Sequence, residues 1–221
     1  MSFVPISVGF VPVSGQILTE IGAEADEIEV LHTMRLRGFV TPAGFEASIG
    51  VHPAELLGAL VESGHVRHIE ARDMYALTPE GKVRHAELFA ESLTAAVGAG
   101  LAEAYPRFLE LNDRFKSLCT DWQVRDDAPN DHTDADYDRD CIERLIALDA
   151  ASDELFAALA TALPRLARYA SRLHHAKTCV VAGDRARFTG VMCESYHDIW
   201  MELHEDLIVM QHIDRVTEGS F

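Results

Sequence analysis

DEIEVLHTMRLRGFVTPAGFEASIGVHPAELLGALVESGHVRHIEARDMYALTPEGKVRHAEL, residues 26–88, is the stretch that decides the fold. Apolar residues recur at helical spacing in its first half, and a glycine follows each of three short helical segments. Thr41 and Thr78 each precede a proline, the arrangement of an N-cap residue followed by the first helical position. Residues 66–69 and 74–77 read as strands on either side of a polar tip. The stretch therefore predicts three helices, a two-stranded ribbon and the start of a further helix.

Three helices followed by a β-ribbon form the pattern of a winged helix-turn-helix. The segment resembles the MarR-like group of winged-helix regulators, most specifically in GHVRH at 64–68 and LTPEG at 77–81. The resemblance implies that the helix over residues 53–63 enters the major groove of DNA, while the ribbon around Arg72 touches the backbone or the minor groove. The residues expected to contact DNA are Arg37, Thr41, His52, Ser63, Arg67, His68 and Arg72.

The charge of the chain leaves a second interpretation open. The net charge is −17, and the helix over residues 53–63 carries Glu55 and Glu62 but no lysine or arginine. Binding to duplex DNA depends on basic side chains that neutralise phosphates, and base edges are normally read by Arg, Lys, Asn or Gln. The alternative is a winged helix that serves as a protein-interaction or dimerisation module and does not bind DNA.

The rest of the chain predicts a mainly α fold. We expect an apolar, strand-like arm over residues 1–20, a winged-helix domain over 21–98 and an antiparallel helical bundle over 99–221, with the break at Gly98-Ala99-Gly100. The arm either crosses to a partner subunit or packs along its own domain. FLELNDRFKSLCTDWQ at 108–123 and ESYHDIWMELHEDLI at 194–208 resemble the C-terminal helical domain of actinobacterial proteins that carry a MarR-like winged helix in front.

Two features of the bundle indicate either a ligand pocket or ordinary packing. Aromatic residues and histidines gather on the last helix, where they line a polar pocket or form an aromatic core with histidines at its edge. The preceding helix has a basic face, which makes ion pairs with acidic residues of the last helix or holds a carboxylate or phosphate effector. The candidate ligand-binding residues are Trp122, Arg168, Arg172, His175, His197, Trp200 and His204.

Other classes of function lack the motifs that they need. The sequence has no nucleotide-binding glycine loop, no GxSxG motif and no HExxH motif, so we expect no catalytic activity and no cofactor. His197 and His204 lie about 10 Å apart along a helix and cannot both bind one metal ion. The four cysteines form no CxxC pair, and no apolar run reaches membrane-spanning length. We therefore expect a cytoplasmic, homodimeric transcriptional regulator with a small anionic effector, or else the protein-interaction module.

Overall fold

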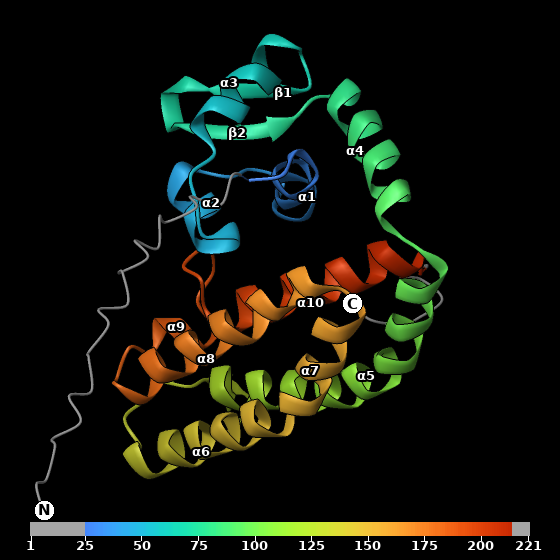
Figure 1. The fold of residues 1–221 in the computed structure, drawn as a ribbon. Helices are drawn as coiled ribbons and strands as arrows, with labels where there is room; N and C mark the ends of the chain where they lie inside the picture. The colour runs from blue at the N-terminus through green and yellow to red at the C-terminus, as the bar shows by residue number, and fades with distance from the viewer. Residues whose placement is uncertain (1–24, 214–221) are drawn as a thin grey trace, which may run out of the picture.

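The computed structural model describes residues 25–213, which are mainly helical and include two small antiparallel sheets (Figure 1). The apolar arm predicted over residues 1–20 lies outside the described residues. Two hydrophobic cores form, a smaller one in the N-terminal part and a larger one in the helices that follow. We call residues 25–78 the head and residues 95–213 the bundle. Within residues 25–213, the helices are too short or too polar to cross a membrane.

The head contains the three helices and the ribbon that the sequence predicts. Thr41 accepts a hydrogen bond from the backbone N–H of Gly44 at 3.0 Å, as an N-cap does. The ribbon strands pair antiparallel, from Val66 opposite Leu77 to Ile69 opposite Met74. The elements are α1 (Glu27–Arg37), α2 (Pro42–Ile49), α3 (Ala54–Glu62), β1 (Val66–Ile69), the 3-10 turn η1 (Glu70–Arg72) and β2 (Met74–Leu77).

Helix α4 (Pro79–Ser92) connects the head to the bundle. Thr78 caps it by accepting a hydrogen bond from the backbone N–H of Gly81 at 3.0 Å. Leu88 packs against the core of the head, and Phe89 belongs to the core of the bundle. Because consecutive side chains of α4 enter the two cores, this helix ties the two parts of the chain together.

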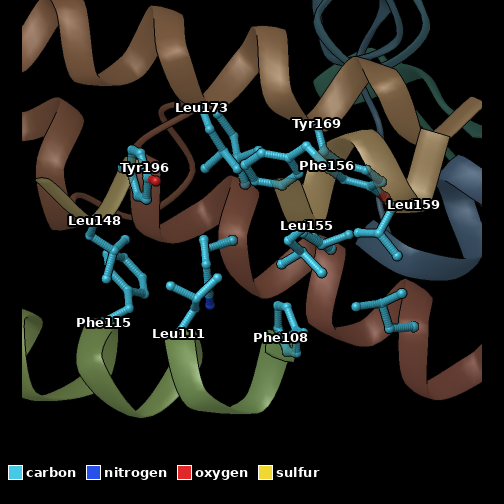
Figure 2. Packing of buried hydrophobic residues seen from close by; sticks show 14 of the residues in the cluster. Phe108, Leu111, Phe115, Leu148, Leu155, Phe156, Leu159, Tyr169, Leu173 and Tyr196 are labelled. Carbon is cyan, nitrogen blue, oxygen red and sulfur yellow. The ribbon is translucent and has the colours of Figure 1, made fainter. Parts of the chain in front are cut away.

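The bundle surrounds one continuous apolar core (Figure 2). Phe108, Leu111 and Phe115 of α5 face side chains from α6, α7, α8 and α10 in this core. The elements are α5 (Ala95–Gln123), β3 (Val124–Arg125), β4 (Ala128–Pro129), α6 (Ala135–Ala151), α7 (Asp153–Ala162), the 3-10 turn η2 (Pro164–Leu166), α8 (Ala167–Val181), α9 (Ala186–Thr189) and α10 (Tyr196–Gln211).

The chain does not break at Gly98-Ala99-Gly100, where the sequence suggested a domain boundary, because α5 begins at Ala95 and runs through all three residues. Thr94 caps this helix, so the chain turns between α4 and α5 instead. Gly100 serves helix packing: a Cβ atom there would lie 2.9 Å from the Cβ of Ala162 on α7. A glycine that allows two helices to approach closely looks the same in a sequence as a glycine that ends a helix.

Candidate functional site

Helix α3 and the β1–β2 ribbon lie at the end of the head farthest from the bundle (Figure 1). Leu57 and Leu60 anchor α3 in the core of the head. The opposite side of α3 is open to solvent, and we call it the α3 outer face. Its residues are Ala54, Glu55, Gly58, Ala59, Val61 and Glu62.

The α3 outer face is chemically simple. Glu55 and Glu62 supply its only charges, and its other side chains are small or apolar. Base edges are read by side chains that offer directed hydrogen bonds, mostly Arg, Lys, Asn and Gln, and α3 has none of these. A surface of small residues flanked by carboxylates is instead complementary to a surface that carries basic side chains.

The ribbon carries the exposed basic residues of this end of the head. Arg67 and Arg72 are exposed, and the Arg67 guanidinium lies over the ring of Phe39 at 5.8 Å. His68 stacks on Tyr75 with ring centroids 4.4 Å apart, and its Nε2 lies 2.9 Å from a carboxylate oxygen of Asp73. The ribbon therefore offers two arginines to a partner, while its histidine is held by intramolecular contacts.

Arg37, one of the predicted DNA-contacting residues, points toward the bundle. Its Nη2 lies 2.6 Å from a carboxylate oxygen of Glu194, and its Nη1 donates a hydrogen bond to the Ser48 hydroxyl at 2.6 Å. Thr41 is occupied as the cap of α2. The Arg37 guanidinium is therefore bound by a carboxylate of another element, while its contact with DNA stays a prediction. Of the predicted set, Ser63, Arg67, His68 and Arg72 are exposed and His52 is partly buried.

A buried cluster of polar side chains joins the head to the bundle, and the sequence analysis missed it. Asp206 of α10 is completely buried and accepts two hydrogen bonds from Arg165, at 2.6 and 2.8 Å, and one from the Tyr169 hydroxyl at 2.9 Å. His32 of α1 contacts the same carboxylate through its Nε2 at 2.8 Å. The other ring nitrogen of His32 lies 2.9 Å from Nε2 of His85 on α4. We call these five residues the interface cluster.

The hydrogen bonds of the interface cluster determine which ring nitrogens of His32 and His85 carry a proton. Asp206 can only accept, so His32 Nε2 donates, and a neutral His32 then accepts from His85 through Nδ1. Burial lowers the pKa of His32, although Asp206 opposes this effect. Burial together with His32 lowers the pKa of His85 to about 4. Burial alone would raise the pKa of Asp206, but Arg165 and His32 hold it well below its ordinary value. Neutral histidines and an ionised aspartate therefore prevail at neutral pH.

A second group of ion pairs lies beside the interface cluster. Arg172 of α8 donates to both carboxylate oxygens of Glu202, each at 2.8 Å, and to Glu194 at 2.9 Å. Arg37 of the head approaches the same two glutamates, Glu194 at 2.6 Å and Glu202 at 3.8 Å. The basic face of α8 therefore pairs with acidic residues around the last helix, which is one of the two arrangements that the sequence left open.

The aromatic residues of the predicted ligand pocket lie in the core of the bundle. Trp200 is fully buried and donates a hydrogen bond from Nε1 to Asn112 at 3.0 Å. Trp122 packs elsewhere, against the rings of His132 and Phe188. His204 is buried beside Phe108, and His197 lies near Phe115 at 6.2 Å between ring centroids. These four residues form aromatic packing, the other alternative from the sequence.

Arg168, Arg172 and His175 lie along a groove between α2 and α8, which we call the α2–α8 groove. It consists of two hollows of about 420 Å³ each, and both are lined by Ala47, Ser171 and Arg172. Arg168 lines one hollow and His175 the other. The structure therefore brings three of the seven predicted ligand-binding residues to one surface feature, at the boundary between head and bundle.

The described part of the chain gives no metal centre, since within residues 25–213 no three His, Cys, Asp or Glu side chains are grouped to hold an ion. Comparisons with protein-family models, with curated proteins and with solved structures found no match to this chain.

Proposed function

We propose that the head is a winged helix and that the chain is a regulatory protein whose α3 outer face docks a protein partner. In this proposal the bundle holds the winged helix in a fixed orientation, through the interface cluster and the ion pair of Arg37 with Glu194. The chain has no catalytic step in this role. The transcriptional function implied by the MarR-like sequence resemblance would then be exercised through a bound protein.

The composition of α3 is the observation that carries the proposal. A helix that faces solvent at the free end of a domain, anchored by Leu57 and Leu60, is placed to meet a large partner. Its outer face has two carboxylates and no basic side chain, so phosphates would be repelled and a basic protein surface attracted. At long range, the chain's net charge of −17 also repels nucleic acid and attracts basic proteins.

Photo-crosslinking in the producing cell tests this proposal. A photo-reactive amino acid at Ala59, which is exposed on α3, is expected to give a discrete adduct that protease removes and nuclease leaves intact. The same amino acid at exposed Glu110 on α5 is the matched control and is expected to give no such adduct. Charge reversal by Glu55→Lys with Glu62→Lys should abolish the adduct at Ala59. An adduct that nuclease removes, or equal adducts at both positions, would overturn the proposal.

A second candidate function is DNA binding by a homodimer of this winged helix. The observation that favours it is the exposure of Arg67 and Arg72 on the ribbon, which are free to reach phosphates or the minor groove. In that case the double variant Arg67→Ala with Arg72→Ala would lose a nucleic-acid adduct. The charge-reversal variant of α3 would give the same adduct as the native chain. Analytical ultracentrifugation of the full chain would show whether the dimer that this candidate requires is formed.

A further inference from the structure

We propose that the α2–α8 groove binds a small oxyanion, a carboxylate or a phosphate, through the guanidinium of Arg168. The groove crosses the boundary between the two parts of the chain: Ala47 and Ser48 line it from the head, and Arg168 and Ser171 line it from the bundle. This inference goes beyond the docking function of α3 and does not depend on which macromolecule docks there.

Arg168 has unused hydrogen-bonding capacity. Its Nε and Nη2 atoms are shielded from solvent and have no hydrogen-bond partner among the described residues. These two atoms form the side edge of the guanidinium, whose parallel N–H groups match the two oxygens of a carboxylate or phosphate. The same edge of Arg84 is satisfied within this chain, donating to the two oxygens of Glu27 at 3.0 and 2.9 Å. An oxyanion on Arg168 would reproduce that pairing.

The arginines on either side of Arg168 along α8 already have carboxylate partners. Arg165 is hydrogen-bonded to Asp206, and Arg172 is hydrogen-bonded to Glu202. The ion pair of Arg168 is longer, with Nη1 3.6 Å from a carboxylate oxygen of Glu29. Buried donors without partners cost stability, so an added acceptor is favoured at Arg168 more than at its neighbours.

The surroundings of Arg168 set the size and charge of the ligand. Arg187 adds positive charge in the adjoining hollow, which His175 and Glu194 also line, while Glu29 and Glu46 line the hollow of Arg168. Because Glu29 lies 3.6 Å from Arg168 and Glu46 lines the same hollow, repulsion between like charges favours a compact ligand with one or two oxyanion groups over a long polyanion. Since Nε and Nη2 are shielded, the guanidinium must turn from its place over the Tyr169 ring toward the groove when it binds.

Isothermal titration calorimetry of the full chain tests the site, with inorganic phosphate in one arm and succinate in the other. Sodium chloride of equal ionic strength is the control for general salt effects. We expect saturable binding of at least one of the two anions, and the arm that binds identifies the oxyanion class. Absence of saturable heat with both anions at millimolar concentration would overturn the proposal.

Two variants locate the binding. Arg168→Gln keeps a polar side chain but removes the guanidinium, and it should weaken binding at least about tenfold, because two charge-assisted hydrogen bonds are lost. Ser171→Trp fills the groove from an exposed position, and it should also abolish binding. Arg107→Gln on α5, which alters an exposed ion pair with Glu154, should leave binding unchanged. Native affinity in both groove variants would place the anion elsewhere and refute the inference. Crosslinking at Ala59 is a separate readout, so either proposal can fail alone.

Discussion

Removing the charge of Asp206 tests how strongly the interface cluster, which His32 extends from the bundle to the head, stabilises the fold. Asn has nearly the same shape as Asp, so Asp206→Asn keeps the volume of the side chain while it removes the negative charge and replaces one acceptor oxygen by an NH2 donor. Arg165, whose side chain is 15% exposed, would then carry a positive charge without its hydrogen-bonded partner. Breaking a buried pair in this way costs about 3–5 kcal/mol, a large share of the free energy of unfolding of an ordinary domain.

Urea unfolding measures this cost, and an exposed ion pair supplies the control. Glu154→Gln breaks the contact of Glu154 with Arg107 at 2.6 Å, but the Glu154 side chain is 79% exposed, so the loss should stay below about 1 kcal/mol. The double variant Arg165→Gln with Asp206→Asn should lose less than the sum of the two single variants, because the partners interact directly. Equal losses for Asp206→Asn and Glu154→Gln would refute the role assigned to the interface cluster.

Two further predictions concern stability. The pKa of His85 is lowered to about 4, so the unfolded chain binds this proton first; stability is complete above about pH 6.5 and falls as the pH drops toward 4. The loss of unfolding free energy should be about 2 kcal/mol after allowance for solvent screening. His85→Gln should reduce the dependence of the urea midpoint on pH, whereas His174→Gln, at an exposed position, should not. Gly81→Ala would place a Cβ 1.9 Å from the carbonyl oxygen of His65, so thermal unfolding should show a loss of at least about 2 kcal/mol. Gly58→Ala, where a Cβ meets no atom within 4 Å, should instead gain up to about 1 kcal/mol, and a loss equal to that of Gly81→Ala would contradict this reasoning.

The local features of the head could be predicted from the sequence because each depends on neighbouring residues. The caps at Thr41 and Thr78 are read from a threonine followed by a proline, and the ribbon from two short strands around a polar tip. Gly100 shows the limit of such signals. Its role is to let α5 approach Ala162 on α7, and nothing in the neighbouring sequence distinguishes that role from a helix end.

The interface cluster could not be predicted in the same way. His32 and Asp206 are 174 positions apart, and only the packing of α1 on α10 brings them together. One signal was present: Asp206 lies among Leu203, Leu207 and Met210 on the apolar stripe of the last helix, where an ionised side chain needs a buried partner. The same packing brings Arg37 to Glu194, whereas the sequence alone suggested that Arg37 faces DNA.

Binding of the full chain to fluorescently labelled, random-sequence duplex DNA at low ionic strength distinguishes a protein-docking head from a DNA-binding one. Because the α3 outer face carries carboxylates and no basic side chain, the account predicts no change in fluorescence anisotropy at micromolar protein. A salt-sensitive rise in anisotropy that Arg67→Ala with Arg72→Ala abolishes would contradict it and establish the DNA-binding alternative.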